Sequence, residues 1–493
     1  MSKKILNAGV ILNVIGTLLI INGIVMLFAL PFSFYYPGDF NANIYIDLLI
    51  SSGITLTIGF LLRRFTYEFR NAEIRKRDGY LIVVGGWLCM SLFGCLPYLL
   101  SGSIPNFTDA FFETISGFTT TGSSILDNIE TLPKSILFWR STTQWIGGMG
   151  IIVLTIAILP LLGIGGMELF VAESPGPTKD KIHPRIKETA KRLWLIYLSL
   201  TTVETVLLMC CGLDFFDAIN HSMTTTSTGG FSTKQASIAA FDNFYVEGVI
   251  IFFMLLSGTN FTLLYFGLKL NIKKIISNDE FKWLMTAVIG LVVIITSVMF
   301  FQGRASSLLN GLRDVSFQVV SIITTTGFST ADYTLWGPFI TFIFFLLLFS
   351  GASAGSTSGG IKIVRIVLLI KNGLLEFKRR LHPKAVIPVQ LNNESVSSKI
   401  IYNLLAFIFL YLFTFSLGAI FMTALGIDFL TSISSVASAL SNVGPGIEQV
   451  GPSNSYSNIP KIGKWFLSFL MLMGRLELFT VAVLFTPYFW KRN

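Results

Sequence analysis

The sequence is poor in charged residues, histidine and cysteine. Only 13% of its 493 residues are charged, whereas soluble domains contain about a quarter. With 52% hydrophobic residues and a mean hydropathy of +0.69, a water-soluble protein of this size could not cover its apolar surface. The composition therefore excludes an ordinary cytosolic enzyme, a disordered chain and a soluble nucleic-acid-binding protein. It predicts an all-α polytopic membrane protein.

The few cysteines and histidines form no pattern typical of a disulfide or a metal site. The four cysteines lie inside apolar runs without a CxxC spacing, at Cys89, Cys95, Cys210 and Cys211. We expect them to be buried small hydrophobic residues. The three histidines, His183, His221 and His382, do not cluster, so we assign them no metal or proton-relay role.

Long apolar runs dominate the chain. A helix that crosses a bilayer needs about 20 mostly apolar residues, and we predict ten such spans. They lie near 8–34, 44–62, 80–100, 136–162, 193–212, 247–268, 283–301, 339–370, 400–425 and 465–490. The first run is too long for the apolar region of a signal peptide, so it is predicted to be a retained helix.

Basic residues gather on one side of these spans. If the N-terminus lies inside, the loops 63–78, 167–192, 269–282 and 371–399 are cytoplasmic and, with the termini, hold most of the Lys and Arg. Cytoplasmic loops carry such an excess. The sequence thus predicts a multi-pass protein of the cytoplasmic membrane, in contact with lipid, with both termini cytoplasmic.

Four shorter segments resemble half-length helices that run into a small polar strip with glycine. They occupy 109–122, 214–233, 309–330 and 428–446, with glycines at Gly122, Gly229, Gly327 and Gly444. The order span, half-helix, strip, span thus recurs four times, with every strip on the outer side. This predicts four repeats in a pseudo-fourfold arrangement rather than inverted repeats. The expected units are an N-terminal two-helix domain at 1–75 and pore repeats at 76–190, 191–282, 283–395 and 396–493.

Non-helical strips at membrane depth carry backbone carbonyls without helical partners, which are tolerated only where they are buried in protein or line water. Four strips around one axis can replace the hydration shell of an alkali cation with carbonyl oxygens. The half-helices add the negative ends of their dipoles. A single strip is equally compatible with helix packing, but its fourfold recurrence favours an ion path.

The four strips, the run GASAGSTSGGIK at 351–362 and the loop ESPGPTKDKIHPR at 173–185 resemble the Trk/Ktr/HKT superfamily of potassium transporters over essentially the whole chain. The two additional N-terminal spans favour the bacterial TrkH type. The resemblance implies a potassium filter, with K⁺ as the transported ion. Its residues would be Thr120, Thr121, Gly122, Ser227, Thr228, Gly229, Thr325, Thr326, Gly327, Asn442, Val443 and Gly444. Gly230 leaves the register of the second set open by one residue. A serine at the first-repeat glycine accompanies sodium transport in eukaryotic members, so Gly122 favours potassium.

Two features inside predicted spans are candidates for a gate. The run 351–360 interrupts the span 339–370 with Gly351, Gly355, Gly359 and Gly360. It would either line a cavity or form a close-packed kink. Arg475 lies in the last span, where a charge is costly and a functional candidate by default. The alternative for Arg475 is a structural ion pair with Glu477. The resemblance implies that the run and Arg475 work together as a barrier in the pore.

Two other functions remain to be weighed. One is a sodium or weakly selective cation pathway. The other is an intramembrane serine hydrolase, because GASAG matches the G-x-S-x-G motif with Ser353 as nucleophile. That motif requires a strand-turn-helix setting and a histidine partner, which this span does not offer, so we expect no enzyme. The resemblance also implies a homodimer and a separate cytosolic TrkA-type nucleotide-binding regulatory subunit.

Overall fold

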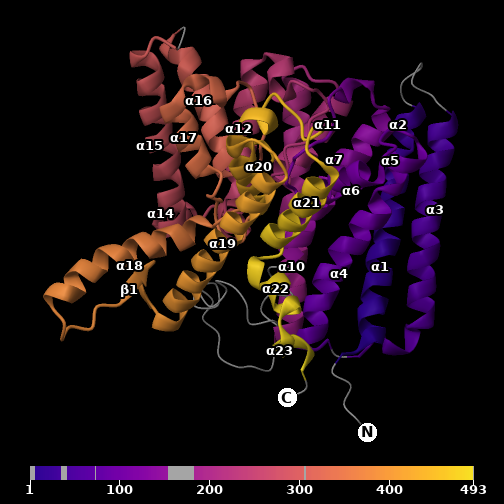
Figure 1. Cartoon of the computed structure of the whole chain (residues 1–493), viewed down its shortest axis with the longest axis horizontal. Helices are drawn as coiled ribbons and strands as arrows, with labels where there is room; N and C mark the ends of the chain where they lie inside the picture. Colours follow the sequence, from indigo (N-terminus) through magenta and orange to yellow (C-terminus); the bar gives the residue numbers. More distant parts are fainter. Residues whose placement is uncertain (1–5, 35–41, 73, 154–181, 305–306, 492–493) are drawn as a thin grey trace.

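The computed structural model describes residues 6–34, 42–72, 74–153, 182–304 and 307–491, and Figure 1 shows that most of them are helical. Six helical stretches in this part are long and apolar enough to cross a membrane, and two bent helix pairs reach that length together. The prediction of an all-α polytopic membrane protein is confirmed.

Two long helices precede α4 (Lys76–Gly94) in the described part of the chain. Helix α1 (Ala8–Met26) packs against α3 (Ala42–Phe65). The short elements η1 (Leu27–Ala29) and α2 (Pro31–Phe34) follow α1, and η2 (Tyr67–Phe69) follows α3. The buried Asn13 Nδ2 donates to the carbonyl oxygen of Thr66 at 3.2 Å and ties the two helices together. Helix α1 also packs against α4, the first helix of the repeated part.

The remaining helices repeat one order four times: a long helix, a half-length helix, a non-helical strip and a second helix. The elements up to the second pass are α4 (Lys76–Gly94), α5 (Leu96–Leu100), α6 (Phe107–Phe118), η3 (Ile129–Thr131), α7 (Lys134–Val153), α10 (Ile182–Cys210), α11 (Phe215–Thr226), η5 (Ser237–Phe241), α12 (Phe244–Gly258), α13 (Phe261–Leu268) and α14 (Ile272–Ser277). The later ones are α15 (Asp279–Phe301), α16 (Leu308–Ile323), η6 (Tyr333–Trp336), α17 (Pro338–Leu347), α18 (Ile363–Leu381), β1 (Val389–Leu391), β2 (Glu394–Val396), α19 (Ser398–Ala424), α20 (Phe429–Ser441), η7 (Glu448–Val450), α21 (Lys461–Arg475), α22 (Leu478–Ala482), η8 (Val483–Phe485) and α23 (Pro487–Trp490). The half-length helices α6, α11, α16 and α20 all lie in the upper half of Figure 1.

Three of the ten predicted spans are not single straight helices. The stretch 247–268 is α12 and α13, which meet at an angle of 110°, and 465–490 contains α21 and the segment from α22, which meet at 116°. The stretch 339–370 is only the short α17, a loop and the start of α18. Apolar composition did not reveal the bends within 247–268 and 465–490, whereas the polar run 351–360 marked the break within 339–370. The end of the predicted span 136–162 and most of the loop 167–192 lie outside the described residues.

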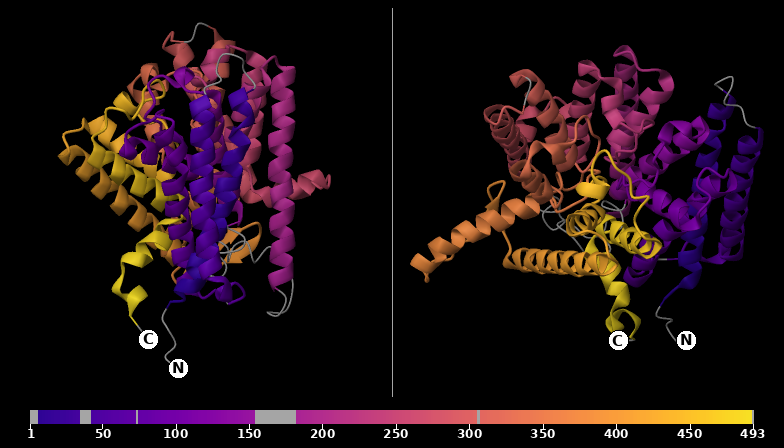
Figure 2. Two further views of the ribbon diagram at one scale, coloured as in Figure 1. Left: turned by 90° about the vertical axis from the view of Figure 1, so that its right-hand side faces the viewer. Right: turned by 45° about the horizontal axis from the view of Figure 1, so that its top comes forward.

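A small hairpin was not expected in an all-α chain. Strands β1 and β2 pair antiparallel, with Gln390 opposite Ser395, and follow α18. Figures 1 and 2 show α18 and this hairpin projecting from the rest of the molecule. Helix α18 exposes a row of apolar side chains on this projection, at Ile370, Leu374, Phe377 and Leu381.

Candidate ion-conduction site

Each half-length helix begins at a side-chain cap. Asn106, Asp214, Ser307 and Asp428 each accept a hydrogen bond from a backbone N–H of the first turn, at 2.9 to 3.2 Å. Ser, Asp and Asn are preferred at this position because the first helical N–H groups have no partner within the helix. The sequence thus fixes the start of all four helices locally.

All four helices also end in the same way. The residue after the last turn adopts a left-handed conformation, with φ of 50° at Thr120, 53° at Thr228, 57° at Thr325 and 55° at Asn442. The next residue returns its N–H to the helix five residues back, at 2.8 to 3.1 Å, which is the Schellman pattern. Three of these residues are β-branched, for which a positive φ is a genuine outlier. Such strain costs about 1–3 kcal/mol per residue and tends to occur at functional sites.

The strips that follow form a closed ring. A Cβ atom on Gly122 would lie within 3.0 Å of the carbonyl oxygen of Gly229. A Cβ atom on Gly230 would lie equally close to the carbonyl oxygen of Thr326. The same holds for Gly327 against the carbonyl of Val443, and for Gly444 against that of Thr121. Strip one therefore touches strip two, two touches three, three touches four, and four touches one. Each contact places a glycine, where no side chain would fit, against the peptide oxygen of its neighbour.

The ring contacts also indicate which residues of the second strip correspond to those of the other three strips. These residues begin at Thr228, one position after the predicted start at Ser227. Thr228, Gly229 and Gly230 occupy the backbone positions of Thr120, Thr121 and Gly122, because they share the same hydrogen bonds and signs of φ. Ser227 instead caps the end of α11. From here the four strips are residues 120–122, 228–230, 325–327 and 442–444.

An ion pair behind the ring joins the first strip to its own half-helix. The carboxylate of Glu113, in α6, accepts from Arg140 Nε at 2.6 Å, from Ser124 Oγ at 3.0 Å and from the backbone N–H of Ile125 at 2.9 Å. Both charged side chains are buried, with 0% and 2% of their surface exposed. A buried pair persists only with such complete hydrogen bonding, so this one holds the segment after the first strip rigidly.

The Gly-rich loop (351–360) lies directly against the ends of three half-helices. Thr325 Oγ1 accepts the backbone N–H of Gly359 at 2.7 Å, and Thr357 Oγ1 donates to the carbonyl of Thr226 at 3.1 Å. Gly359 has no room for a Cβ because the carbonyl oxygen of Ser441 lies against it. The structure thus brings the loop and the ring together.

Arg475 meets the same loop at the bend between α21 and α22. Its Nη1 donates to the carbonyl of Thr357 at 2.8 Å and its Nη2 to the carbonyl of Gly147 at 3.2 Å. The alternative of an ion pair with Glu477 is wrong, because Glu477 pairs with Arg365 at 2.5 Å. Among the described residues no carboxylate forms a salt bridge with Arg475, so the guanidinium faces carbonyl oxygens with its charge uncompensated.

Charged residues that the sequence analysis did not single out also hold the loop. Glu280, at the start of α15, accepts the backbone N–H of Ala354 at 2.7 Å. Lys362 Nζ donates to the carbonyl oxygen of Ser358 within the loop itself. Their positions were a signal, because Glu280 directly precedes a predicted span, Lys362 lies within one and Glu113 lies within an apolar half-helix.

The geometry does not support a hydrolase at Ser353. Its hydroxyl is buried and has no hydrogen-bond partner among the described residues. His221 is instead bonded to Ser232 and to the backbone of Asp217, and His382 follows the far end of α18. A serine nucleophile needs a base within hydrogen-bond reach.

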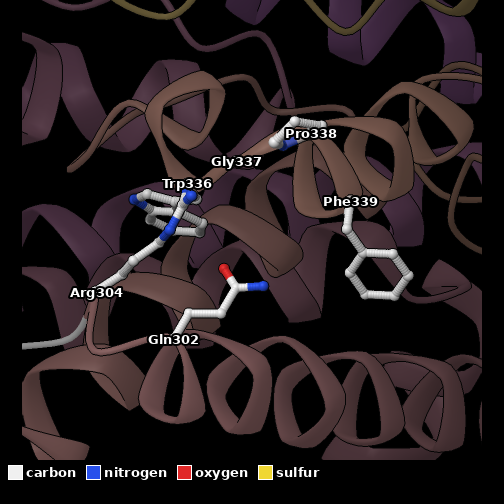
Figure 3. Close-up of a pocket in the computed structure, with 6 residues that line it drawn as sticks. All are labelled: Gln302, Arg304, Trp336, Gly337, Pro338 and Phe339. Atoms are coloured by element: carbon white, nitrogen blue, oxygen red, sulfur yellow. The ribbon is translucent and has the colours of Figure 1, made fainter.

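A pocket of about 540 Å³ lies apart from the ring, where α15 ends and α17 begins. Figure 3 shows its lining, Gln302, Arg304, Trp336, Gly337, Pro338 and Phe339, none of which belongs to a strip. Its one charge is the cation Arg304, which donates to the carbonyl of Leu335 at 3.3 Å. A basic lining does not suit a cation path, so the ring remains the candidate site.

Comparison with known proteins agrees with this architecture. Residues 49–492 match the family described as TrkH, cation transport protein. The chain belongs to the TrkH family. Its relatives in this family include the Trk system potassium uptake protein TrkH of Halomonas elongata, 41% identical over 98% of this chain and 99% of that protein. The protein of the same description from Escherichia coli (strain K12) is 43% identical over 89% of this chain and 91% of its own length.

A solved TrkH structure has the same fold. The crystal structure of the potassium transporter TrkH from Vibrio parahaemolyticus matches with a TM-score of 0.88 and 35% identity, over 98% of this chain and 99% of that one. The TrkH family is a family of cation transport proteins and not of enzymes, which agrees with the unpartnered hydroxyl of Ser353.

Proposed function

We propose that the chain conducts potassium ions across the cytoplasmic membrane through the ring of strips. This proposal rests on the closed ring of contacts between the four strips. A ring of this kind surrounds one axis with peptide oxygens that carry no net charge. Such oxygens replace part of the hydration shell of an alkali cation while letting it leave again. The relatives described above are potassium uptake proteins by name, which favours K⁺ over Na⁺ as the ion.

The filter in this proposal consists of the twelve residues of the strips. The four helix dipoles support it, because each Schellman-terminated end lies next to its strip and carries about half a negative charge. The same left-handed turn begins every strip, with φ between 50° and 57°. Strained turns of this kind are a reason to suspect function rather than packing.

The Gly-rich loop and Arg475 form the gate in this proposal. The loop contacts half-helix ends of repeats two, three and four, and Arg475 fastens it to the carbonyl of Gly147 in α7 of repeat one. Its guanidinium, which pairs with no carboxylate in the described part of the chain, repels cations on their way through. Conduction therefore requires the bond between Arg475 and Thr357 to open.

Orientation and partners complete the proposal. The basic residues in the predicted cytoplasmic loops support an orientation with both termini and the α18 projection in the cytoplasm. The exposed apolar row on α18 supports a homodimer, since apolar side chains on a projecting helix become buried when a second copy packs there. The names of the relatives place them in a Trk system, so we propose a TrkA-type nucleotide-binding subunit as the cytosolic partner.

Flux measurements in liposomes test the function. Purified protein is reconstituted, and K⁺ and Na⁺ fluxes are measured separately, with and without the cytosolic partner. We expect K⁺ to pass faster than Na⁺. Equal rates would establish a weakly selective cation pathway instead, and faster Na⁺ would establish a sodium transporter.

A further inference from the structure

One strip lacks a side chain that the other three possess. Thr121, Thr326 and Val443 occupy the middle position of strips one, three and four, whereas Gly229 occupies it in strip two. The hydroxyl of Thr121 is 2.7 Å from that of Thr119, and Thr326 bonds in the same way to Thr324 at 2.8 Å. These two side chains brace their strips against their own half-helices. Gly229 cannot do so.

The amide of Gln144 fills the vacant position. A Cβ on Gly229 would lie within 3.0 Å of Cδ, Oε1 and Nε2 of Gln144. Nε2 donates to the carbonyl oxygen of Gly229 at 2.6 Å, and Oε1 accepts the backbone N–H of Phe231 at 3.0 Å. The side chain is completely buried. One amide thus satisfies both a donor and an acceptor of the strip, and it comes from α7 of the neighbouring repeat.

A second side chain on the same face of α7 extends this contact. Arg140 lies one turn before Gln144, a spacing that places both on one side of the helix. Its Nη1 donates to the carbonyl of Ser232 at 2.9 Å, and its guanidinium lies 3.5 Å from the ring centre of Phe231. Helix α7 therefore holds the backbone from Gly229 to Ser232 at two points.

We propose that Gln144 is a specificity-determining positioning residue of the filter. Its amide stands in for the side chain missing at Gly229 and fixes the direction of the Gly229 carbonyl. This inference rests on the proposed potassium filter. Without the amide, the Gly229 carbonyl and the Phe231 N–H lose their partners and the strip gains free space, so its peptide can rotate away from the orientation that the ring requires.

A double-substitution cycle tests the proposal through the ratio of K⁺ to Na⁺ flux in liposomes. Gln144→Ala is expected to lower the ratio roughly tenfold, as expected when buried hydrogen-bonding groups lose their partner. Gly229→Thr alone is expected to lower it as well, since the new side chain collides with the amide. The double variant Gln144→Ala with Gly229→Thr is expected to recover most of the ratio. Gly229 does not have a positive φ, so its backbone accepts the threonine that stands at the equivalent positions 121 and 326.

Two further variants keep the test independent of folding. Gln144→Met preserves the volume but removes both hydrogen bonds, and it is expected to lower the ratio while the protein still elutes as a single species. Gln302→Met, at the end of α15, is the matched control and is expected to keep the wild-type ratio. A wild-type ratio of K⁺ to Na⁺ flux in Gln144→Met would overturn the role of Gln144. The same conclusion would follow if the ratio in the double variant fell by as much as the two single effects combined. A wild-type protein without any preference for K⁺ would overturn the proposed filter itself.

Discussion

Arg475 donates a hydrogen bond of 2.8 Å to the carbonyl oxygen of Thr357. Arg475 ends α21, and Thr357 lies in the Gly-rich loop, 118 positions earlier in the chain. The bond joins a buried cation to a loop that contains four glycines and lies against the ring of strips. Charge-assisted bonds of this kind contribute about 1.5–3 kcal/mol each, enough to hold a loop closed and yet weak enough to be released by a partner protein.

Replacing Arg475 by Ala is therefore expected to increase leak flux through the protein in liposomes by at least roughly tenfold, because the loop loses its anchor and the pore loses its positive charge. The measurement is K⁺ flux without the cytosolic partner. Arg304→Ala, an exposed arginine beside the pocket of Figure 3, is the control and is expected to leave the leak unchanged. An unaltered or lower leak in Arg475→Ala would remove the gate hypothesis.

Thr325→Val tests the contact between the third strip and the loop. Valine keeps the β-branched shape but cannot accept the N–H of Gly359, which Thr325 Oγ1 now binds at 2.7 Å. Losing one such bond costs about 1 kcal/mol, so we expect leak flux to rise roughly fivefold. Thr341→Val, in α17 away from the strips, serves as the control. Equal leak in the two variants would show that this bond does not hold the loop.

Local sequence patterns were sufficient to predict the half-length helices and three of the four strips. Each helix has its own cap, its own apolar face and a polar sequence with glycine after it, and none of these depends on distant residues. The second strip was different because Gly229 and Gly230 are adjacent and either fits the local pattern. The choice between them shows only in the folded chain, where Gly230 and not Gly229 lies against the carbonyl oxygen of Thr326, 96 positions later in the chain.

The bends of 110° and 116° within two spans and the partners of buried charges could not be predicted for a related reason. The loop after α17 occupies residues 348–362, a few residues beyond the glycines on either side, and its backbone is held by Glu280 at Ala354 and by Thr325 at Gly359. Likewise Glu477 lies two residues from Arg475 but pairs with Arg365, which approaches it only in the folded chain.

Gly122→Ser is expected to reduce the preference for K⁺ over Na⁺ by roughly tenfold or more, because a side chain there meets the carbonyl of Gly229 and displaces the ring oxygens on which selectivity depends. Gly102→Ser is a matched control. Gly102 also has a positive φ, of 67° against 85° at Gly122, but nothing lies within 4 Å of its Cβ position. Both variants carry the same type of backbone strain, so a loss of selectivity in Gly122→Ser alone assigns the effect to the ring. Unchanged selectivity in Gly122→Ser would contradict the filter assignment.

Glu113→Gln is expected to lower the stability of the protein by about 3–5 kcal/mol, because it leaves Arg140 buried without a countercharge. The measurement is thermal unfolding of the purified protein in detergent. Glu376→Gln is the control, since Glu376 is 51% exposed and its pairs with Arg379 and Arg380 contribute about 0–1 kcal/mol.

The double variant Glu113→Met with Arg140→Met separates charge from packing. Replacing a whole buried pair by apolar side chains of similar size is often close to neutral, although here Arg140 also binds the carbonyl of Ser232. We therefore expect the double variant to unfold at a higher temperature than Glu113→Gln and at a lower one than the wild type. If Glu113→Gln were as stable as Glu376→Gln, the pair would not support the first strip, and the rigidity of the ring would have to come from the caps and the Schellman turns alone.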